Sequence, residues 1–197
     1  MVSRVESAAA TRRALLDAAA DLLDSGGPEA VTLREVGARA GVTRGAPYRH
    51  FPNKDSLLTV IASEALDQLT DDIRAVRSRL RTSSAGMLQQ ALSVLMDVGR
   101  GQPHLYRLMF TSPVGDTAVV DAAERAGERA QDEFLAIIGD LVGEQYARHF
   151  AALILASVHG VTDMHAHGHL ATDKWNTTAQ ELVSTLVSMI DRYAQGA

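Results

Sequence analysis

Apolar residues recur every three or four positions along most of the chain, the spacing of one face of an α-helix. Two long sets show this spacing: Leu58, Ile61, Ala65, Leu69, Ile73, Val76 and Leu80, and Val119, Ala123, Ala126, Ala130, Phe134, Ile137 and Leu141. No segment shows the convincing alternation of apolar and polar residues that marks a half-buried strand. The pattern therefore predicts an all-α protein.

Proline and glycine positions divide this pattern into separate helices. The chain has five prolines, none of them after Pro113. About nine helices are predicted, near residues 11–25, 32–40, 44–50, 54–81, 84–100, 103–110, 116–142, 145–168 and 173–194. They group into a small N-terminal domain over residues 1–55 and a larger helical domain over residues 56–197.

The first three predicted helices have the layout of a DNA-binding motif. Thr11 is expected to cap the first helix and Gly26 to end it, while Thr32 opens the second helix with capping-box spacing. Residues 41–43 form a short glycine-containing connection to the next helix, residues 44–50. Two short helices joined in this way form a helix-turn-helix, whose second helix enters the major groove of DNA.

Charge and cysteine content narrow the classes of function. Residues 1–60 carry a net charge of +1 and residues 61–197 carry −6, within a total of −5. Only the first third therefore avoids repelling a polyanion, as expected for a local nucleic-acid-binding surface. The absence of cysteine excludes disulfides, thiol chemistry and zinc fingers.

The chain lacks the sequence signals of membrane proteins and of common enzyme classes. The longest apolar run, residues 150–156, is too short to span a bilayer, and no secretory apolar region follows the N-terminus. We therefore expect no membrane partner and a cytoplasmic location. The chain has no G-x-S-x-G, H-E-x-x-H, G-x-x-x-x-G-K-[ST] or G-x-G-x-x-G motif. It is predicted not to be an enzyme, with no catalytic residues and no cofactor.

Three stretches carry a family resemblance: TRRALLDAA at residues 11–19, TLREVG at 32–37 and GVTRGAPYRHFPNKDSLL at 41–58. They resemble the N-terminal domain of tetracycline-repressor (TetR) family transcriptional regulators. The resemblance implies a DNA-binding homodimer, most often a repressor, whose C-terminal helical domain encloses a small-molecule pocket. Pro47 departs from the commonest pattern, but a proline in the first turn of a helix is expected to be tolerated.

Residues 32–54 supply groups suited to DNA. Arg44 is predicted to read guanine through O6 and N7, the alternative being a contact with phosphate or solvent. Gly45 and Ala46 are small enough to let the groove approach the backbone. Thr32, Arg34 and Thr43 are predicted to contact phosphate. The resemblance implies the same role for Tyr48, His50 and Lys54. The predicted DNA-binding set is Thr32, Arg34, Thr43, Arg44, Gly45, Ala46, Tyr48, His50 and Lys54. Thr32 and Thr43 also serve as caps, whereas Tyr48 and His50 could instead pack in the core.

The later part of the chain offers candidates for ligand binding. Its stretch around His159, Gly160, Met164 and Gly168 resembles the WHG type of TetR C-terminal domain, with Leu155 where that type has tryptophan. Apolar and aromatic residues with a few polar groups suit an unidentified, largely apolar effector. The predicted ligand residues are Met96, Tyr106, Met109, Phe110, Phe134, His159 and Trp175. The same residues at helical spacing also suit an ordinary core.

The last two long helices carry broad apolar stripes suited to a homodimer. Two such helices from each subunit can pair about a two-fold axis as a four-helix bundle. The predicted interface residues are Phe150, Ile154, Ser157, Val161, Leu182, Leu186 and Ile190. The alternative is that both stripes pack only within their own chain.

Four histidines, His159, His165, His167 and His169, lie close to Asp163 and make a zinc site conceivable. A solvated helix end with imidazoles near its negative pole accounts for them better, so no metal is predicted. The sequence thus predicts a regulator that binds a palindromic double-stranded operator as a homodimer and is released by an effector. Its alternatives are a helical metal or small-molecule carrier that uses the His159–His169 cluster, and a purely structural helical scaffold.

Overall fold

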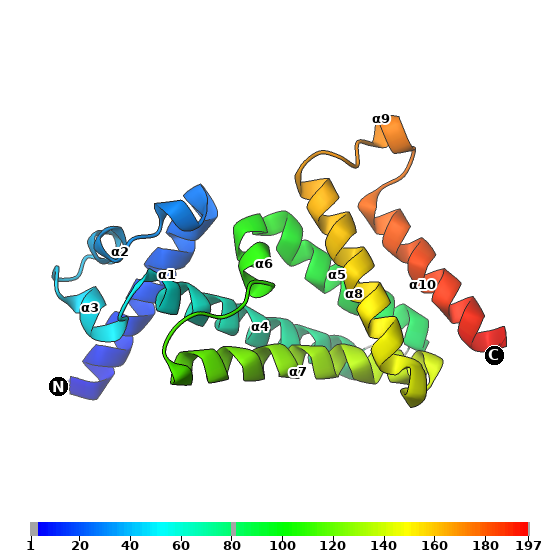
Figure 1. Ribbon diagram of the computed structural model, residues 1–197, viewed down its shortest axis with the longest axis horizontal. Helices are drawn as coiled ribbons and strands as arrows, with labels where there is room; N and C mark the ends of the chain where they lie inside the picture. The colour runs from blue at the N-terminus through cyan, green and yellow to red at the C-terminus, as the bar shows by residue number, and fades with distance from the viewer. Residues whose placement is uncertain (1–3, 80–81, 197) are drawn as a thin grey trace. The chain divides into compact units, whose positions relative to one another are not determined.

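The computed structural model describes residues 4–79 and 82–196 (Figure 1). Within these residues all regular secondary structure is helical, which confirms the all-α prediction. The helices are α1 (Arg4–Ala30), α2 (Leu33–Arg39), α3 (Ala46–His50), α4 (Lys54–Arg79), α5 (Ser84–Gly101), α6 (Pro103–Met109), α7 (Thr117–Val142), α8 (Glu144–Ala166), α9 (Thr172–Trp175) and α10 (Ala179–Gly196). Leu80, predicted on the apolar face of α4, lies outside the described residues.

The chain forms two compact units. The first unit comprises Met1–Leu66 and Gln102–Ala126, and the second comprises Asp67–Gly101 and Gly127–Ala197. The division falls within α4 and within α7, whereas the predicted domain boundary falls after residue 55. No helix in the described part of the chain is both long and apolar enough to cross a membrane.

The core of the first unit forms where α1 meets α2, α3 and α6. Leucines from one face of α1 pack against α2 and the start of α4 because they recur at helical spacing. Its buried members are Leu15, Leu16, Ala18, Ala19, Leu22, Leu23, Val31, Leu33, Val36, Phe51, Leu57, Leu58 and Ile61. This small core holds the helix-turn-helix together.

Helix α1 differs at both ends from its predicted form. It begins at Arg4, and Thr11 lies inside it, where its hydroxyl donates to the Ser7 carbonyl oxygen at 2.9 Å. The predicted cap at Thr11 is therefore wrong, because the residues before it continue the helix. The backbone break is at Gly27, which has a φ of 68°, rather than at Gly26. A Cβ atom at Gly27 would lie 3.0 Å from the His104 ring of α6.

The helix-turn-helix follows the prediction with one shift. Thr32 caps α2, its hydroxyl accepting from the Glu35 backbone N–H at 3.1 Å, as predicted. Gly41 turns the chain with a φ of 65°. Helix α3 then begins at Ala46 with Gly45 as its cap, so the expected start two residues earlier and the cap at Thr43 are wrong.

Helix α3 packs against α2 through an unusually close contact. A Cβ atom placed on Gly37 of α2 would lie 2.7 Å from Cγ of Pro47, in the first turn of α3. Both residues are buried, so the missing side chain lets the proline ring lie on the α2 backbone. Pro47 is thus accommodated, as its position in the first turn predicted.

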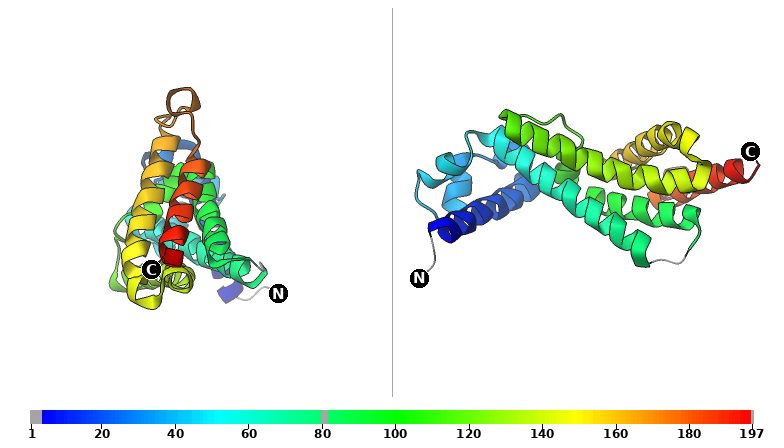
Figure 2. Two further views of the ribbon diagram at one scale, coloured as in Figure 1. Left: turned by 90° about the vertical axis from the view of Figure 1, so that its right-hand side faces the viewer. Right: turned by 90° about the horizontal axis from the view of Figure 1, so that it is seen from below.

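The second unit is built around α5, α8 and α10, which contact one another in every pairing. Figures 1 and 2 both show α8 and α10 running side by side. Its core is mostly leucine, isoleucine, valine and alanine, including Leu88, Leu92, Leu95, Ile137, Ile138, Ile154, Val158, Val183, Val187 and Ile190. These helices therefore use one face for their own core, as their apolar spacing predicted.

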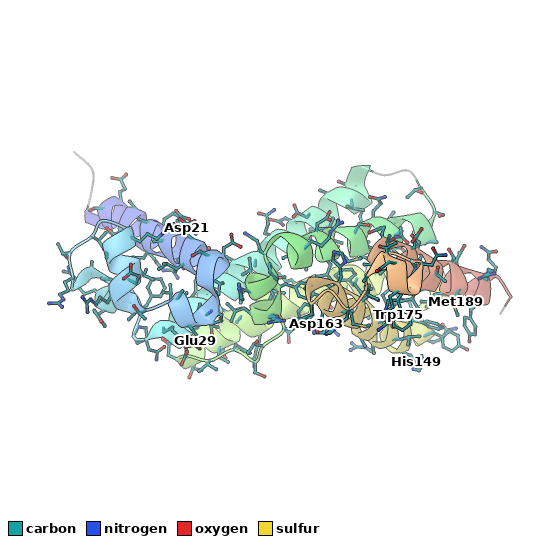
Figure 3. The ribbon with its side chains drawn as sticks, turned by 90° about the horizontal axis from the view of Figure 1, so that it is seen from above. Asp21, Glu29, His149, Asp163, Trp175 and Met189 are labelled. Atoms are coloured by element: carbon teal, nitrogen blue, oxygen red, sulfur yellow. The ribbon has the colours of Figure 1, made fainter. Side chains whose placement is uncertain are left out.

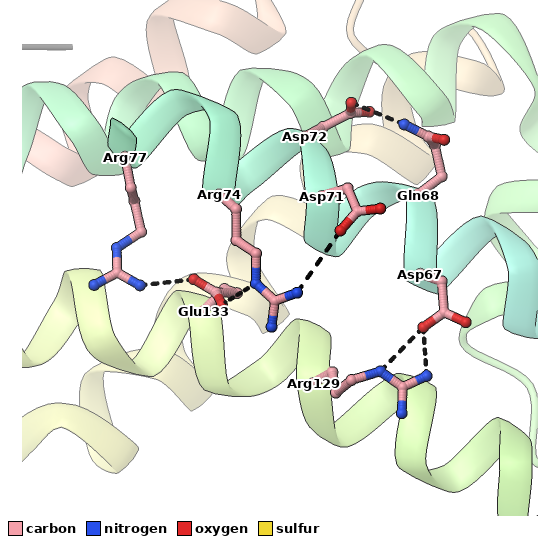
Figure 4. Close-up of polar contacts among 8 residues, drawn as sticks. All are labelled: Asp67, Gln68, Asp71, Asp72, Arg74, Arg77, Arg129 and Glu133. Atoms are coloured by element: carbon pink, nitrogen blue, oxygen red, sulfur yellow. Dashed lines mark hydrogen bonds and ion pairs between the residues drawn. The ribbon is translucent and has the colours of Figure 1, made fainter. Parts of the chain in front are cut away.

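Ion pairs join α4 to α7 within the second unit (Figure 4). Glu133 of α7 is buried and accepts hydrogen bonds from Arg74 and Arg77 of α4, each at 2.7 Å. Arg129 pairs with Asp67 in the same way. Burial alone would raise the pKa of Glu133, but the two arginine hydrogen bonds outweigh it and lower that pKa below its ordinary value of 4.5.

The predicted last helix is divided into α9 and α10. Asn176 ends α9 in a left-handed conformation with a φ of 49°. Thr178 then caps α10, its hydroxyl accepting from the Glu181 N–H at 3.2 Å, while the Glu181 carboxylate accepts from the Thr178 N–H at 2.7 Å. This capping box was missed, although its T-x-x-E spacing is visible in the sequence.

Gly37→Ala is expected to lower the free energy of unfolding, because overpacking costs about 1–3 kcal/mol, more than the roughly 0.5–1 kcal/mol that alanine adds in a helix. Adding Pro47→Ala removes the ring that the new methyl meets, so the double variant should recover most of the loss. Urea unfolding of the three proteins measures this. A single variant as stable as wild type would show that α2 and α3 separate at no cost.

Glu133→Gln is expected to cost about 1–3 kcal/mol of unfolding free energy near neutral pH, because the charge-assisted bonds from Arg74 and Arg77 weaken. The folded-state pKa of Glu133 is lowered, so its contribution is present above pH 4.5 and is lost as the pH falls below that value.

Denaturant unfolding across this pH range compares wild type with Glu133→Gln, and Glu128→Gln, exposed on the same helix, serves as the control. The control should differ from wild type by no more than about 0.5 kcal/mol. A Glu133→Gln difference that stays constant in acid would contradict the lowered pKa.

Candidate nucleic-acid interface

Three exposed arginines on and around the helix-turn-helix have no ionic partner among the described residues. Arg34 lies on α2, Arg44 in the turn before α3, and Arg49 on α3. None of the three forms an ion pair or side-chain hydrogen bond with any residue in 4–79 or 82–196. Their positive charge is therefore uncompensated within the described chain and is available to an anionic partner.

Two other arginines close to the helix-turn-helix, Arg13 and Arg39, are paired with carboxylates. Arg13 binds Glu64 and Asp17, both at 2.8 Å, and Arg39 binds Asp21 at 3.2 Å. Figure 3 labels Asp21, the α1 residue of the last pair. Carboxylates thus neutralise Arg13 and Arg39, whereas Arg34, Arg44 and Arg49 give α2–α3 a basic surface.

One surface groove runs between α2 and α3. It has a volume of about 540 Å³ and is lined by Arg34, Gly37, Ala38, Val42, Arg44 and Tyr48. Tyr48 is 59% exposed, so its ring does not pack in the core, the alternative left open by the sequence. The groove brings two unpaired guanidinium groups and a phenol hydroxyl together, all of them donors suited to phosphate or base edges.

A second groove lies between α3 and the start of α1. It measures about 650 Å³ and is lined by Ser7, Ala8, Thr11, Gly41, Val42, Thr43, Ala46, Arg49 and His50. His50 is half-buried there and Thr43 is exposed. Ser7 and Arg49 were not predicted as site residues, and the early start of α1 that brings Ser7 here was also missed. Arg49 could have been found from the sequence, because it lies between Tyr48 and His50, two members of the predicted set.

The other residues of the predicted DNA-binding set differ in how exposed they are. Thr32 and Gly45 are exposed at the helix starts that they cap. Ala46 is only 6% exposed, so its methyl group packs inside the unit rather than outward. Lys54 is half-buried at the start of α4, where its Nζ donates to the Pro28 carbonyl oxygen at 3.0 Å. Lys54 therefore also ties the end of α1 to α4.

The predicted ligand residues divide between the two units. Tyr106, Met109 and Phe110 belong to the first unit, where the Tyr106 and Phe110 rings lie 5.0 Å apart. Met96, Phe134, His159 and Trp175 belong to the second unit. Most are buried or half-buried, but Phe110 and Trp175 are exposed, and Figure 3 shows Trp175 on α9.

The predicted interface residues lie on α8 and α10 at different depths. Ile154 and Ile190 are fully buried in the core of their own unit, whereas Phe150, Ser157, Val161, Leu182 and Leu186 are half-buried. Four apolar or aromatic side chains of the same two helices, outside the predicted set, are exposed: Tyr146, Leu153, Met189 and Tyr193. The outer face of α8 runs through 146, 150, 153, 157 and 161, so the predicted stripe mixed it with the inner face.

The histidines of the His159–His169 cluster lie near and beyond the C-terminal end of α8. His167 contacts the Asp163 carbonyl oxygen through Nδ1 at 2.7 Å, and its ring lies 6.3 Å from that of His169. No three His, Asp or Glu side chains come together to hold a metal ion anywhere in the described residues. His167 instead satisfies the end of α8, the solvated-terminus interpretation favoured by the sequence.

Two family profiles match the chain. "Bacterial regulatory proteins, tetR family" matches residues 15–61, and "Tetracyclin repressor-like, C-terminal domain" matches residues 88–194. The first covers the helix-turn-helix and the second covers more than half of the chain. The narrower WHG assignment stays a prediction.

Solved structures share the fold at low sequence identity. A protein of unknown function from Rhodococcus sp. RHA1 is 21% identical, with a TM-score of 0.79 over 92% of this chain and 94% of its own. A TetR transcriptional regulator from the same organism is 19% identical, with a TM-score of 0.67 over 94% and 97%. The regulator FadR from Bacillus subtilis, solved with stearoyl-CoA, is 12% identical, with a TM-score of 0.67 over 90% and 96%.

Arg44→Ala is expected to weaken binding to a selected DNA site by about 1–3 kcal/mol while changing random-duplex binding much less, because a base contact carries sequence information. Arg49→Ala, a matched exposed arginine, should weaken both equally and reduce the salt dependence. Fluorescence anisotropy at several salt concentrations measures both. Equal losses for Arg44→Ala on the two DNAs would remove its base-reading role.

Proposed function

The chain belongs to the TetR family of bacterial regulatory proteins, and we propose that it is a repressor that binds a palindromic operator as a homodimer and is released by a small, largely apolar effector. The observation that carries the proposal is the set of unpaired arginines on α2–α3. Arg34, Arg44 and Arg49 are exposed on a helix-turn-helix whose neighbouring arginines are neutralised. A phosphate backbone supplies the charge they lack.

DNA recognition divides between specific and positioning contacts. Arg44 reads a guanine, and Gly45, with no Cβ, lets the groove edge come close to the turn. Arg34, Tyr48 and Arg49 hold phosphates from the two grooves beside α3. Thr32, Thr43, His50 and Lys54 complete the phosphate set, whereas the buried Ala46 contributes packing.

The α8–α10 face supports a homodimer. Leu153 is 47% exposed, and Tyr146, Met189 and Tyr193 are exposed with it, while the Phe150 and Tyr193 rings lie 5.2 Å apart across the two helices. Figure 3 shows Met189 on α10. A second copy of α8 and α10 covers this apolar surface as a four-helix bundle. The two-fold axis then presents two recognition helices to two half-sites.

An apolar effector fits the composition of the predicted ligand residues. Tyr106 and Met109 are buried within the first unit, and Met96 and Phe134 are buried within the second. The Bacillus subtilis regulator FadR, similar in fold, was solved in complex with stearoyl-CoA, whose acyl chain is apolar. The effector acts by preferring a conformation with a different spacing of the recognition helices, which lowers operator affinity.

The carrier alternative has one observation against it. A metal carrier that uses the His159–His169 cluster needs converging ligands, and the described residues contain no group of three. A small-molecule carrier differs from a regulator in showing no sequence-selective DNA binding. Footprinting on fragments of the source genome separates the two, since a regulator protects a palindromic site.

Leu153→Arg is expected to produce a folded monomer, because it places a charge in the centre of the proposed interface. Operator affinity should fall by about a hundredfold or more, since the two half-sites are then bound independently. Val114→Arg, an equally exposed apolar residue of the first unit, should remain dimeric. Sedimentation velocity and anisotropy measure the two effects. A dimeric Leu153→Arg protein would place the interface elsewhere.

A further inference from the structure

A small cavity lies among α5, α8 and α10 of the second unit. Met96 and Arg100 line it from α5, Thr162 and His165 from α8, and residues 178–180 from the start of α10. Its volume is about 220 Å³. Pockets for drug-sized ligands measure about 300–1,000 Å³, while a cavity of about 150 Å³ holds benzene. The size therefore suits a molecule with a single ring.

The cavity has an apolar interior and a polar entrance. Met96 and Ala179 are buried and form the interior wall. Arg100 and His165 are exposed, and Arg100 is already paired with Asp97 on its own helix. The charged groups therefore lie at the entrance and are partly neutralised there.

Most polar side chains of the wall have partners. The Gln180 amide donates to the Ser93 hydroxyl at 2.9 Å. The Thr178 hydroxyl accepts from the Glu181 N–H at 3.2 Å and donates to its carboxylate at 3.0 Å. These contacts fix the start of α10.

Thr162 is the exception. Its residue is 3% exposed, and its hydroxyl has no hydrogen-bond partner in the described structure. Hydroxyl groups in helices commonly donate to the carbonyl four residues earlier, as Ser157 does to Leu153 at 2.7 Å on the same helix. A buried hydroxyl without a partner is costly, so each such group calls for an explanation.

We propose that this cavity binds a compact, neutral, mostly apolar molecule whose single hydroxyl or carbonyl oxygen bonds to Thr162. Neutrality follows from the interior, since a charged group beside Thr162 would be buried without a counter-charge. The site shares only Met96 with the ligand residues predicted from sequence. Its role as an effector site rests on the proposed function, because α8 and α10 also carry the proposed dimer face.

Benzyl alcohol and ethylbenzene test the proposal. They match in shape, and the hydroxyl group of the first is a methyl group in the second. Calorimetry or ligand-observed NMR measures their binding to the wild-type protein and to Thr162→Val, which keeps the side-chain shape. The preference for the alcohol over the hydrocarbon should fall about three- to tenfold in the variant, the value of one hydrogen bond. Benzoate, the charged probe, should bind more weakly than benzyl alcohol.

Stability provides a second readout with a matched control. Thr162→Val removes a hydroxyl without a partner and should raise the melting temperature of the ligand-free protein. Thr59→Val, at another buried threonine, should lower it, because the Thr59 hydroxyl donates to the Val114 carbonyl at 2.7 Å and accepts from its N–H at 3.1 Å. Ala179→Leu, which fills the cavity, should abolish binding of both neutral probes.

These outcomes test ligand binding in the cavity independently of the proposed regulatory function. Loss of the alcohol preference in Thr162→Val together with loss of binding in Ala179→Leu supports the site. No binding by wild type, binding that both variants leave unchanged, or tighter binding of benzoate overturns it. Operator anisotropy with benzyl alcohol then tests regulation alone: bound probe without DNA release counts against the effector role and leaves the site standing.

Discussion

Gly37 lets α3 pack against α2 at a separation that no larger residue permits, and the basic surface depends on that contact. The Pro47 ring occupies the space where a Cβ would lie, so the first turn of α3 is held by packing rather than by a side-chain cap. Arg44 and Tyr48 line the same groove as Gly37. Their positions relative to α2, and so the shape of the groove they line, follow from a missing side chain.

Pairing with carboxylates distinguishes the structural arginines from those of the proposed DNA-binding surface. Arg13 and Arg39 have carboxylate partners on the helices they face, and Glu133 links two arginines of α4 to α7. Surface pairs of the first kind contribute little to stability, but they remove positive charge from the surface. Lys54 has both roles under the proposed function, since its ammonium group bonds to the end of α1 and keeps other N–H donors for a phosphate.

Helices α8 and α10 contribute to three features of the second unit: its core, its exposed apolar face and its cavity. Their inner faces supply Ile154 and Ile190 to the core, their outer faces expose Leu153 and Tyr193, and their facing ends enclose the cavity beside Thr162. A molecule in that cavity touches the same helices that would meet a second subunit. The cost of an unpartnered hydroxyl is small beside the apolar packing that surrounds it, so the helices can bear it.

The sequence by itself determined the helical class, the Thr32 cap, the turn at Gly41 and the residues of the helix-turn-helix, because these depend on local spacing and backbone preference. The start of α1, the burial of Ala46 and the bond between Lys54 and Pro28 depend on contacts between distant segments, which periodicity does not encode. The same holds for the outer face of α8, since Ile154 and Leu153 are equally apolar neighbours. Only the packing of α5 and α10 decides which one is buried, because each helix can turn just one face toward its own core.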